Sequence, residues 1–162
     1  MTLSTLCQRC GLCCDGSLFT LVPLQAGEVE TARRNALHVV ERADGSHAMR
    51  QRCAALDGAR CTAYADRPET CRKYHCMLFA AVSEGELSVA EAMSVVDEAH
   101  ALIAKVDKAL EPPKPGAPMA VLQRARHADS AQNGGPLGTG ARDAQTRAEK
   151  FLDRHFRGRQ GR

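Results

Sequence analysis

The stretch CQRCGLCC, from Cys7 to Cys14, places four thiols within eight residues near the start of the chain. The remaining cysteines all lie before residue 77. A thiolate is a strong ligand for zinc and for iron–sulfur clusters, and two cysteines separated by two residues can reach the same metal ion. The pattern therefore predicts metal binding in the first half of the chain. The candidate ligands are Cys7, Cys10, Cys13, Cys14, Cys53, Cys61, Cys71 and Cys76.

Length and composition favour one small domain that needs reinforcement. The chain has 162 residues, of which 4% are aromatic, and it contains no Trp. A core built from Leu, Val and Ala alone is modest, and small cores are often stabilised by a disulfide or a metal. The N-terminal residues lack the basic and apolar regions of a secretory signal, and no apolar run reaches the roughly 18 residues that span a bilayer. We therefore expect a soluble, cytoplasmic protein without a membrane segment, where disulfides are uncommon.

The order of hydrophobic and turn residues predicts an α+β fold in the cysteine-bearing half. A short strand is expected around Phe19–Val22, closed by Pro23, followed by a helix over 24–41 and a strand over 47–53. The turn Asp57-Gly58 predicts a hairpin with Cys53 on one arm and Cys61 on the other. A short helix is expected to carry Cys71 and to bring Cys76 near its end.

The clearest predicted element is an amphipathic helix over 88–110. Ser88 and Glu91 have the spacing of a capping box, and Pro112-Pro113 ends the helix. Its apolar stripe predicts packing against the cysteine-bearing half or against a helix of an unknown protein partner. The stripe consists of Val89, Met93, Val96, Ile103, Val106 and Leu110.

The chain after the helix differs in charge and composition. Residues 1–112 carry 12 Lys and Arg against 15 Asp and Glu, a net of −3, whereas residues 113–162 carry 10 against 4, a net of +6. Pro-rich and Gly-rich stretches predict a linker and a basic tail that is partly disordered, with a short helix over 143–157. We therefore divide the chain into a metal-binding domain, 1–111, and a tail, 112–162. Nucleic acid is not expected as a partner, because the basic residues lack interleaved aromatic ones.

Three uses of the thiols remain open from the sequence alone. Two closed four-cysteine zinc sites would be structural and redox-silent. The Cys7-x2-Cys10-x2-Cys13 run is similar to the cluster-binding loop of bacterial ferredoxins, which favours an iron–sulfur protein in electron transfer, although here the fourth cysteine is adjacent. A thiol enzyme of the thioredoxin kind needs a βαβ context that is not apparent, so no residue is assigned a catalytic role and the question of enzymatic activity stays open.

The full pattern resembles the YkgJ-type cysteine-cluster family. The resemblance covers roughly residues 7–80 and rests on the eight cysteines and the residues spaced between them. The matching non-cysteine residues are Gly11, Gly58, Tyr64, Arg67, Pro68, Arg72 and Tyr74. The resemblance implies chelation of zinc or iron, with an iron–sulfur cluster as one form of bound iron, but no defined reaction. His75 departs from the family pattern, in which Pro often precedes the last cysteine, and is either an extra ligand or a surface residue.

Basic residues near the thiols in the sequence can offset the negative charge of a metal–thiolate site. Two four-thiolate zinc sites carry a formal charge of −4, which nearby guanidinium groups reduce. Arg67 and Arg72 are therefore expected beside the site, with Tyr64 packed over it. As a working arrangement we group Cys7 and Cys10 with Cys71 and Cys76, and Cys13 or Cys14 with Cys53 and Cys61.

Overall fold

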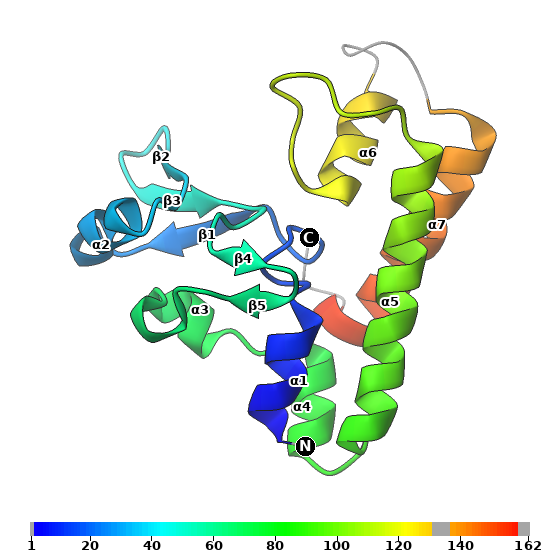
Figure 1. The fold of residues 1–162 in the computed structure, drawn as a ribbon, viewed down its shortest axis with the longest axis horizontal. Coiled ribbons are helices and arrows are strands. Elements are labelled where there is room, and N and C mark those ends of the chain that lie inside the picture. Colours follow the sequence, from blue (N-terminus) through cyan, green and yellow to red (C-terminus); the bar gives the residue numbers. More distant parts are fainter. Residues whose placement is uncertain (1, 131–136, 159–162) are drawn as a thin grey trace.

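Helices and two small antiparallel sheets build the protein, so the α+β prediction is confirmed. The computed structural model describes residues 2–130 and 137–158. Figure 1 shows the sheets on one side of the molecule and the long C-terminal helices on the other, with two short helices between them. Two hydrophobic cores correspond to these two sides.

Strands β1 (Leu21–Leu24), β3 (His47–Arg50) and β2 (Val39–Glu41) form the first sheet in that spatial order. The predicted first strand starts later than expected and includes Pro23 instead of ending before it. Pro23 is tolerated because β1 pairs only with β3 and is therefore an edge strand, where a missing N–H donor faces away from the ladder.

The helix predicted over 24–41 is wrong for most of its length. The chain forms a 3-10 turn, Ala26–Glu28, and a short helix α2, Val29–Arg34. Ala36 then adopts a φ of 56°, which ends the helical path, and the chain continues as β2. The adjacent β-branched residues Val39 and Val40 pair with β3, since such side chains fit a pleated surface better than a helix.

The second sheet is the predicted hairpin, with the turn at Asp57-Gly58. Its strands are β4 (Leu56–Asp57) and β5 (Arg60–Cys61). Cys61 lies on an arm, but Cys53 precedes β4 by three residues, so the expectation of one cysteine on each arm is only half correct. A 3-10 turn, Tyr64–Asp66, leads to α3 (Glu69–Lys73) and α4 (Met77–Ser83).

The predicted long helix is confirmed as α5 (Val89–Ala109). The Ser88 Oγ accepts from the Glu91 N–H at 3.2 Å, and Glu91 Oε2 accepts from the Ser88 N–H at 2.8 Å, which is the expected capping box. One face of α5 is buried against α1, α4, α6 and α7 of the same chain. That face consists of Ala92, Met93, Val96, Ala99, Ile103 and Val106.

Two helices from the C-terminal part of the chain pack against α5. These are α6 (Val121–Asp129) and α7 (Thr139–Leu152), and α7 continues as a π-helical turn, Asp153–Arg157. The helix expected over 143–157 is therefore present and begins four residues earlier. Part of the predicted mobile linker, residues 131–136, lies outside the described residues. The buried apolar residues of this segment join the core of α5; they are Leu122, Ala125, Ala148, Leu152 and Phe156.

Candidate metal centre

Helix α1 (Leu3–Cys10) carries the first two cysteines of the motif. Cys7 and Cys10 are one turn apart, which places both on the same side of the helix. The helix ends at Gly11, whose φ of 67° requires a residue without a Cβ. A Cβ at Gly11 would also lie 3.0 Å from the Ala59 Cα, so this glycine lets the cysteine loop approach the β4–β5 hairpin.

The loop that carries Cys13 and Cys14 is fixed by backbone hydrogen bonds. The Cys14 N–H donates to the Gly11 carbonyl at 2.9 Å, and the Cys53 N–H donates to the Cys14 carbonyl at 2.8 Å. The second bond joins the loop to the segment between β3 and β4. It thereby brings Cys53 next to the CC pair, although 38 residues of chain separate them.

Three side chains that the sequence did not single out as site residues also hold this loop. Gln51 is 2% exposed, and its Nε2 donates to the Cys13 carbonyl at 2.8 Å. The His100 Nε2 on α5 donates to the Cys10 carbonyl at 2.7 Å. Arg157 donates from Nη2 to the Ser17 carbonyl. No sequence pattern indicates these contacts, because they join positions far apart in the chain.

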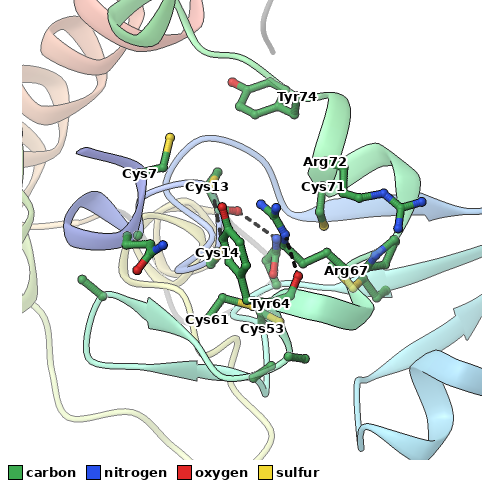
Figure 2. A pocket seen from close by; sticks show the side chains of 18 of the residues that line it. Cys7, Cys13, Cys14, Cys53, Cys61, Tyr64, Arg67, Cys71, Arg72 and Tyr74 are labelled. Carbon is green, nitrogen blue, oxygen red and sulfur yellow. Dashed lines mark hydrogen bonds between the residues drawn. The ribbon is translucent and has the colours of Figure 1, made fainter. Parts of the chain in front are cut away.

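Six of the eight cysteines line one cavity of about 300 Å³. Figure 2 shows Cys13 and Cys14 in the middle of the site, with Cys53 and Cys61 on one side and Cys7 on the other. Cys71 enters from α3. The two remaining cysteines, Cys10 and Cys76, do not line this cavity and pack against the helical core.

The thiols divide into two groups of four by the core that they contact. Cys10, Cys13 and Cys76 pack against the helical core, and the charge of Cys7 acts on Cys10. We call these four the first thiol set. The second thiol set packs around the sheet core and consists of Cys14, Cys53, Cys61 and Cys71. The working arrangement grouped Cys71 with Cys7 and Cys10, whereas in the metal-free chain Cys71 packs against the sheet core with Cys53 and Cys61 among its neighbours.

The two sets meet at the adjacent residues Cys13 and Cys14. Their Sγ atoms are 3.8 Å apart. A hydrogen bond between these thiols lowers the pKa of Cys13 and raises that of Cys14, because the first ionised sulfur is stabilised by its neighbour's S–H and opposes a second charge. The junction therefore holds one negative charge more readily than two.

Burial keeps most of the other thiols protonated in the metal-free chain. Burial and the nearby thiols Cys13, Cys53 and Cys61 raise the pKa of Cys71 to about 12. Burial raises the pKa values of Cys10, Cys53 and Cys76 as well. Each is a low-dielectric site in which a thiolate needs a compensating positive charge, and a coordinated metal ion is the strongest such charge.

The donor chemistry of the cavity fits zinc or iron, although the thiols are not closed around a point. In residues 2–130 and 137–158, no three Cys, His, Asp or Glu side chains converge closely enough to hold one ion as they stand. All eight cysteines are unpaired thiols. Binding would therefore draw sulfurs inward from the cavity wall and release their protons.

The residues expected around the thiols differ in their placement. The Arg67 guanidinium lies 3.6 Å from the centre of the Tyr64 ring, and Arg67 Nε donates to the Tyr64 carbonyl at 3.0 Å. Figure 2 shows Arg67 reaching among the thiols, whereas Arg72 lies toward the outside. Arg72 is exposed, and its charge acts on Glu69.

The rings of Tyr74 and His75 also line the cavity. Tyr74 packs edge-on against Phe19 with ring centres 4.9 Å apart. His75 is exposed and stacks on Phe79 at 4.3 Å, so its ring is engaged by an aromatic neighbour. Both positions belong to the wall of the cavity.

A family model of cysteine-rich proteins, CxxCxxCC, matches residues 6–99. Its description is "Putative zinc- or iron-chelating domain". The chain belongs to this family. The match runs from α1 to the middle of α5 and includes every cysteine, so metal binding by the cysteine cluster agrees with the family, and the resemblance drawn from the sequence is confirmed.

The other comparisons add no relative. Neither a curated protein nor a solved structure matches the chain. None of the helices in the described part of the chain combines the length and apolar character that a membrane-spanning segment needs.

Proposed function

We propose that this protein binds metal in two neighbouring centres, one in each thiol set, with all ligands supplied by cysteine thiolates. The first centre would use Cys7, Cys10, Cys13 and Cys76, and the second Cys14, Cys53, Cys61 and Cys71. The observation that carries this proposal is the division of seven thiols between two cores, with Cys7 joined to the first set by its charge interaction with Cys10. Four thiolates are the donor set of closed, redox-silent zinc sites, so a structural or regulatory zinc module is the first candidate.

Several features of the site support a bound cation. Burial raises the pKa of Cys10 and Cys71, so a thiolate at either position needs a compensating positive charge, which a coordinated cation would supply. The sheet core contains no aromatic side chain among its buried residues, so metal coordination would supply much of the stability of that half. A reducing compartment such as the cytoplasm would keep all eight thiols available.

An iron–sulfur centre is the second candidate, and the size of the cavity favours it. The cavity measures about 300 Å³, and its thiols line the wall instead of meeting at one point. A cluster brings inorganic sulfide that occupies space between cysteines, which two single ions do not. The Cys7-x2-Cys10-x2-Cys13 spacing supports the same reading.

Metal and sulfide analysis of the full chain, purified without oxygen, separates the two candidates. Two zinc ions per chain and no visible absorbance support the zinc module. Iron with acid-labile sulfide and a broad band near roughly 400 nm supports the iron–sulfur protein. A chain that binds neither metal above one equivalent under reducing conditions contradicts both.

Paired variants test the division into two sets. Cys76→Ser removes a thiol from the first set and Cys71→Ser from the second, and each is expected to lose one metal equivalent and keep the other. The double variant is expected to lose both. If either single variant loses both equivalents while its α5 helix remains folded, the thiols form one centre and the division is wrong.

A further inference from the structure

Arg67 lines the thiol cavity and contacts an aromatic ring at its wall. Its guanidinium lies over the Tyr64 ring at 3.6 Å, inside the cavity lined by thiols of both sets. The hydrogen bond from Nε to the Tyr64 carbonyl uses one donor and leaves the two Nη groups available for the cavity. Figure 2 shows this side chain reaching inward between Cys13 and Cys71.

Within the described part of the chain, no carboxylate pairs with Arg67. The ion pairs there involve other cations: Lys73, Arg124, Arg126, Arg142 and Arg157. A guanidinium that is half-buried without a carboxylate needs another source of negative charge, because desolvation of an uncompensated cation is costly. No Asp or Glu lines its cavity, so thiolates are the groups there that would balance its charge.

The charge of Arg67 reaches both thiol sets. Arg67 lines the same cavity as Cys7 and Cys13 of the first set and Cys71 of the second. Arg72 also lines this cavity, but it is exposed and lies toward the outside. Arg67 is therefore placed to interact with metal–thiolate charge on both sides of the junction.

The closeness of the two sets creates the need for such a cation. A divalent ion held by four thiolates carries a formal charge of −2, and the junction thiols Cys13 and Cys14 are 3.8 Å apart. The first bound ion leaves an anionic centre beside the second set and opposes the gathering of four more thiolates there. A fixed guanidinium between the sets offsets this repulsion in a cavity of low dielectric.

We propose that Arg67 is a shared countercharge that allows both thiol sets to hold metal at once, acting as a positioning residue and not as a ligand. The proposal rests on the two-centre function proposed above. Arg67 would then contribute little to the first binding event and much to the second. Tyr64 would hold the guanidinium in place through its ring face and its carbonyl.

A stepwise Cd²⁺ titration of the metal-free full chain, against a competing chelator and under reducing conditions, tests this role. Arg67→Gln removes the charge, and the second dissociation constant is expected to rise about 10–100-fold while the first changes little, as found for residues that support metal ligands. Arg67→Lys keeps the charge and is expected to restore most of the second affinity. Arg42→Gln removes an exposed arginine just after β2 that does not line the cavity, and it serves as the matched control, with both constants as in the unaltered chain.

The outcomes separate this inference from the two-centre function itself. If the unaltered chain binds fewer than two Cd²⁺ ions, both fail. If the unaltered chain binds two ions and Arg67→Gln weakens both steps equally or neither, the shared countercharge is wrong and the two centres stand. If Arg67→Gln does not fold, Tyr64→Leu, which removes the ring beneath the guanidinium and keeps the charge, is expected to weaken the second step alone, and an unchanged second step overturns the inference.

Discussion

The half of the molecule around the thiol cavity and the half built from α5, α6 and α7 are stabilised by different interactions. The sheet half buries small and medium apolar side chains beside protonated thiols. The helical half buries a continuous stripe of α5 against neighbouring helices and includes Phe156, which is 1% exposed. On the two-centre proposal, the helical half folds by apolar burial, whereas the cavity of the thiol half is completed by metal.

Removal of metal is expected to have the largest effect and to act on the sheet half. Structural zinc contributes roughly 10–16 kcal/mol of binding free energy in small zinc domains, and the sheet core has little else of that size. Treatment of the loaded chain with a chelator should therefore abolish amide-exchange protection at Met49 and Cys53 while Val96 on α5 stays protected. The same chelator presaturated with zinc is the control. Equal loss of protection in both halves would show that the two are one cooperative unit.

Truncation in the helical core is expected to have the next largest effect. Leu122 on α6 is fully buried in the core that it shares with α5. A Leu→Ala change at such a site costs about 2–5 kcal/mol through lost burial and a residual cavity. We expect Leu122→Ala to lower the denaturation midpoint without changing the number of bound metal ions. A loss of metal in folded Leu122→Ala protein would show that packing in the helical half helps to determine the geometry of the thiols.

The sequence could predict the two halves to very different extents. The spacing of the cysteines predicts the metal site, because thiols at these spacings have few other uses. The Ser88–Glu91 capping box predicts the start of α5. The packing of α7 was harder to foresee, because it buries Ala141 and Ala148, small residues whose burial leaves no strong apolar pattern. In the same way, nothing local to Arg157 or His100 indicates that each holds the cysteine loop from 140 or 90 residues away.

Replacement of Arg157 tests the contact between the helical half and the cysteine loop. Its side chain is 3% exposed and donates to Glu149 at 2.6 Å and Asp153 at 3.0 Å, besides the Ser17 carbonyl. Loss of one partner of a buried ion pair costs about 3–5 kcal/mol, and the partial exposure of Glu149 and Asp153 places this network at the lower end. Arg157→Gln should lower the free energy of unfolding by about that amount, measured by urea denaturation.

The same variant should also weaken metal binding, because the Ser17 contact holds the end of the loop that carries Cys13 and Cys14. Arg154→Gln, an exposed arginine on the same turn, is the matched control and should change neither property. If Arg157→Gln is destabilised but binds metal as tightly as the unaltered chain, the Arg157 contacts contribute to stability and not to the geometry of the metal site.

A change of pH should separate the metal-free chain from the loaded one. The pKa of Cys71 rises from its ordinary value of 9.0 to about 12 in the folded metal-free chain, mainly through burial. Above pH 9 the unfolded chain ionises this thiol while the folded chain does not, so metal-free stability is full below pH 9 and falls as pH rises toward about 12. In the loaded chain the sign is reversed, because metal holds thiolates and protons displace it as pH falls.

Thermal unfolding of both forms under reducing conditions, from acid to alkaline pH, measures these opposite slopes. Cys71→Ser, prepared metal-free, is the control and should show a shallower alkaline decline. An identical pH dependence for the metal-free and loaded chains would mean that the buried thiols do not take part in binding.

The smallest expected effect isolates the helical half alone. Ser88 Oγ accepts the Glu91 N–H at 3.2 Å at the start of α5, 12 residues after Cys76 and 12 residues before His100. Replacement of an N-cap Ser by Ala costs about 1 kcal/mol, so Ser88→Ala should shift the denaturation midpoint slightly and leave both Cd²⁺ dissociation constants unchanged. Ser94→Ala, on an exposed position within α5, is the control for loss of a hydroxyl. If this cap variant weakened metal binding, the stability of α5 would have to be counted as part of the site, because His100 on that helix donates to the Cys10 carbonyl and would transmit the fraying to the first thiol set.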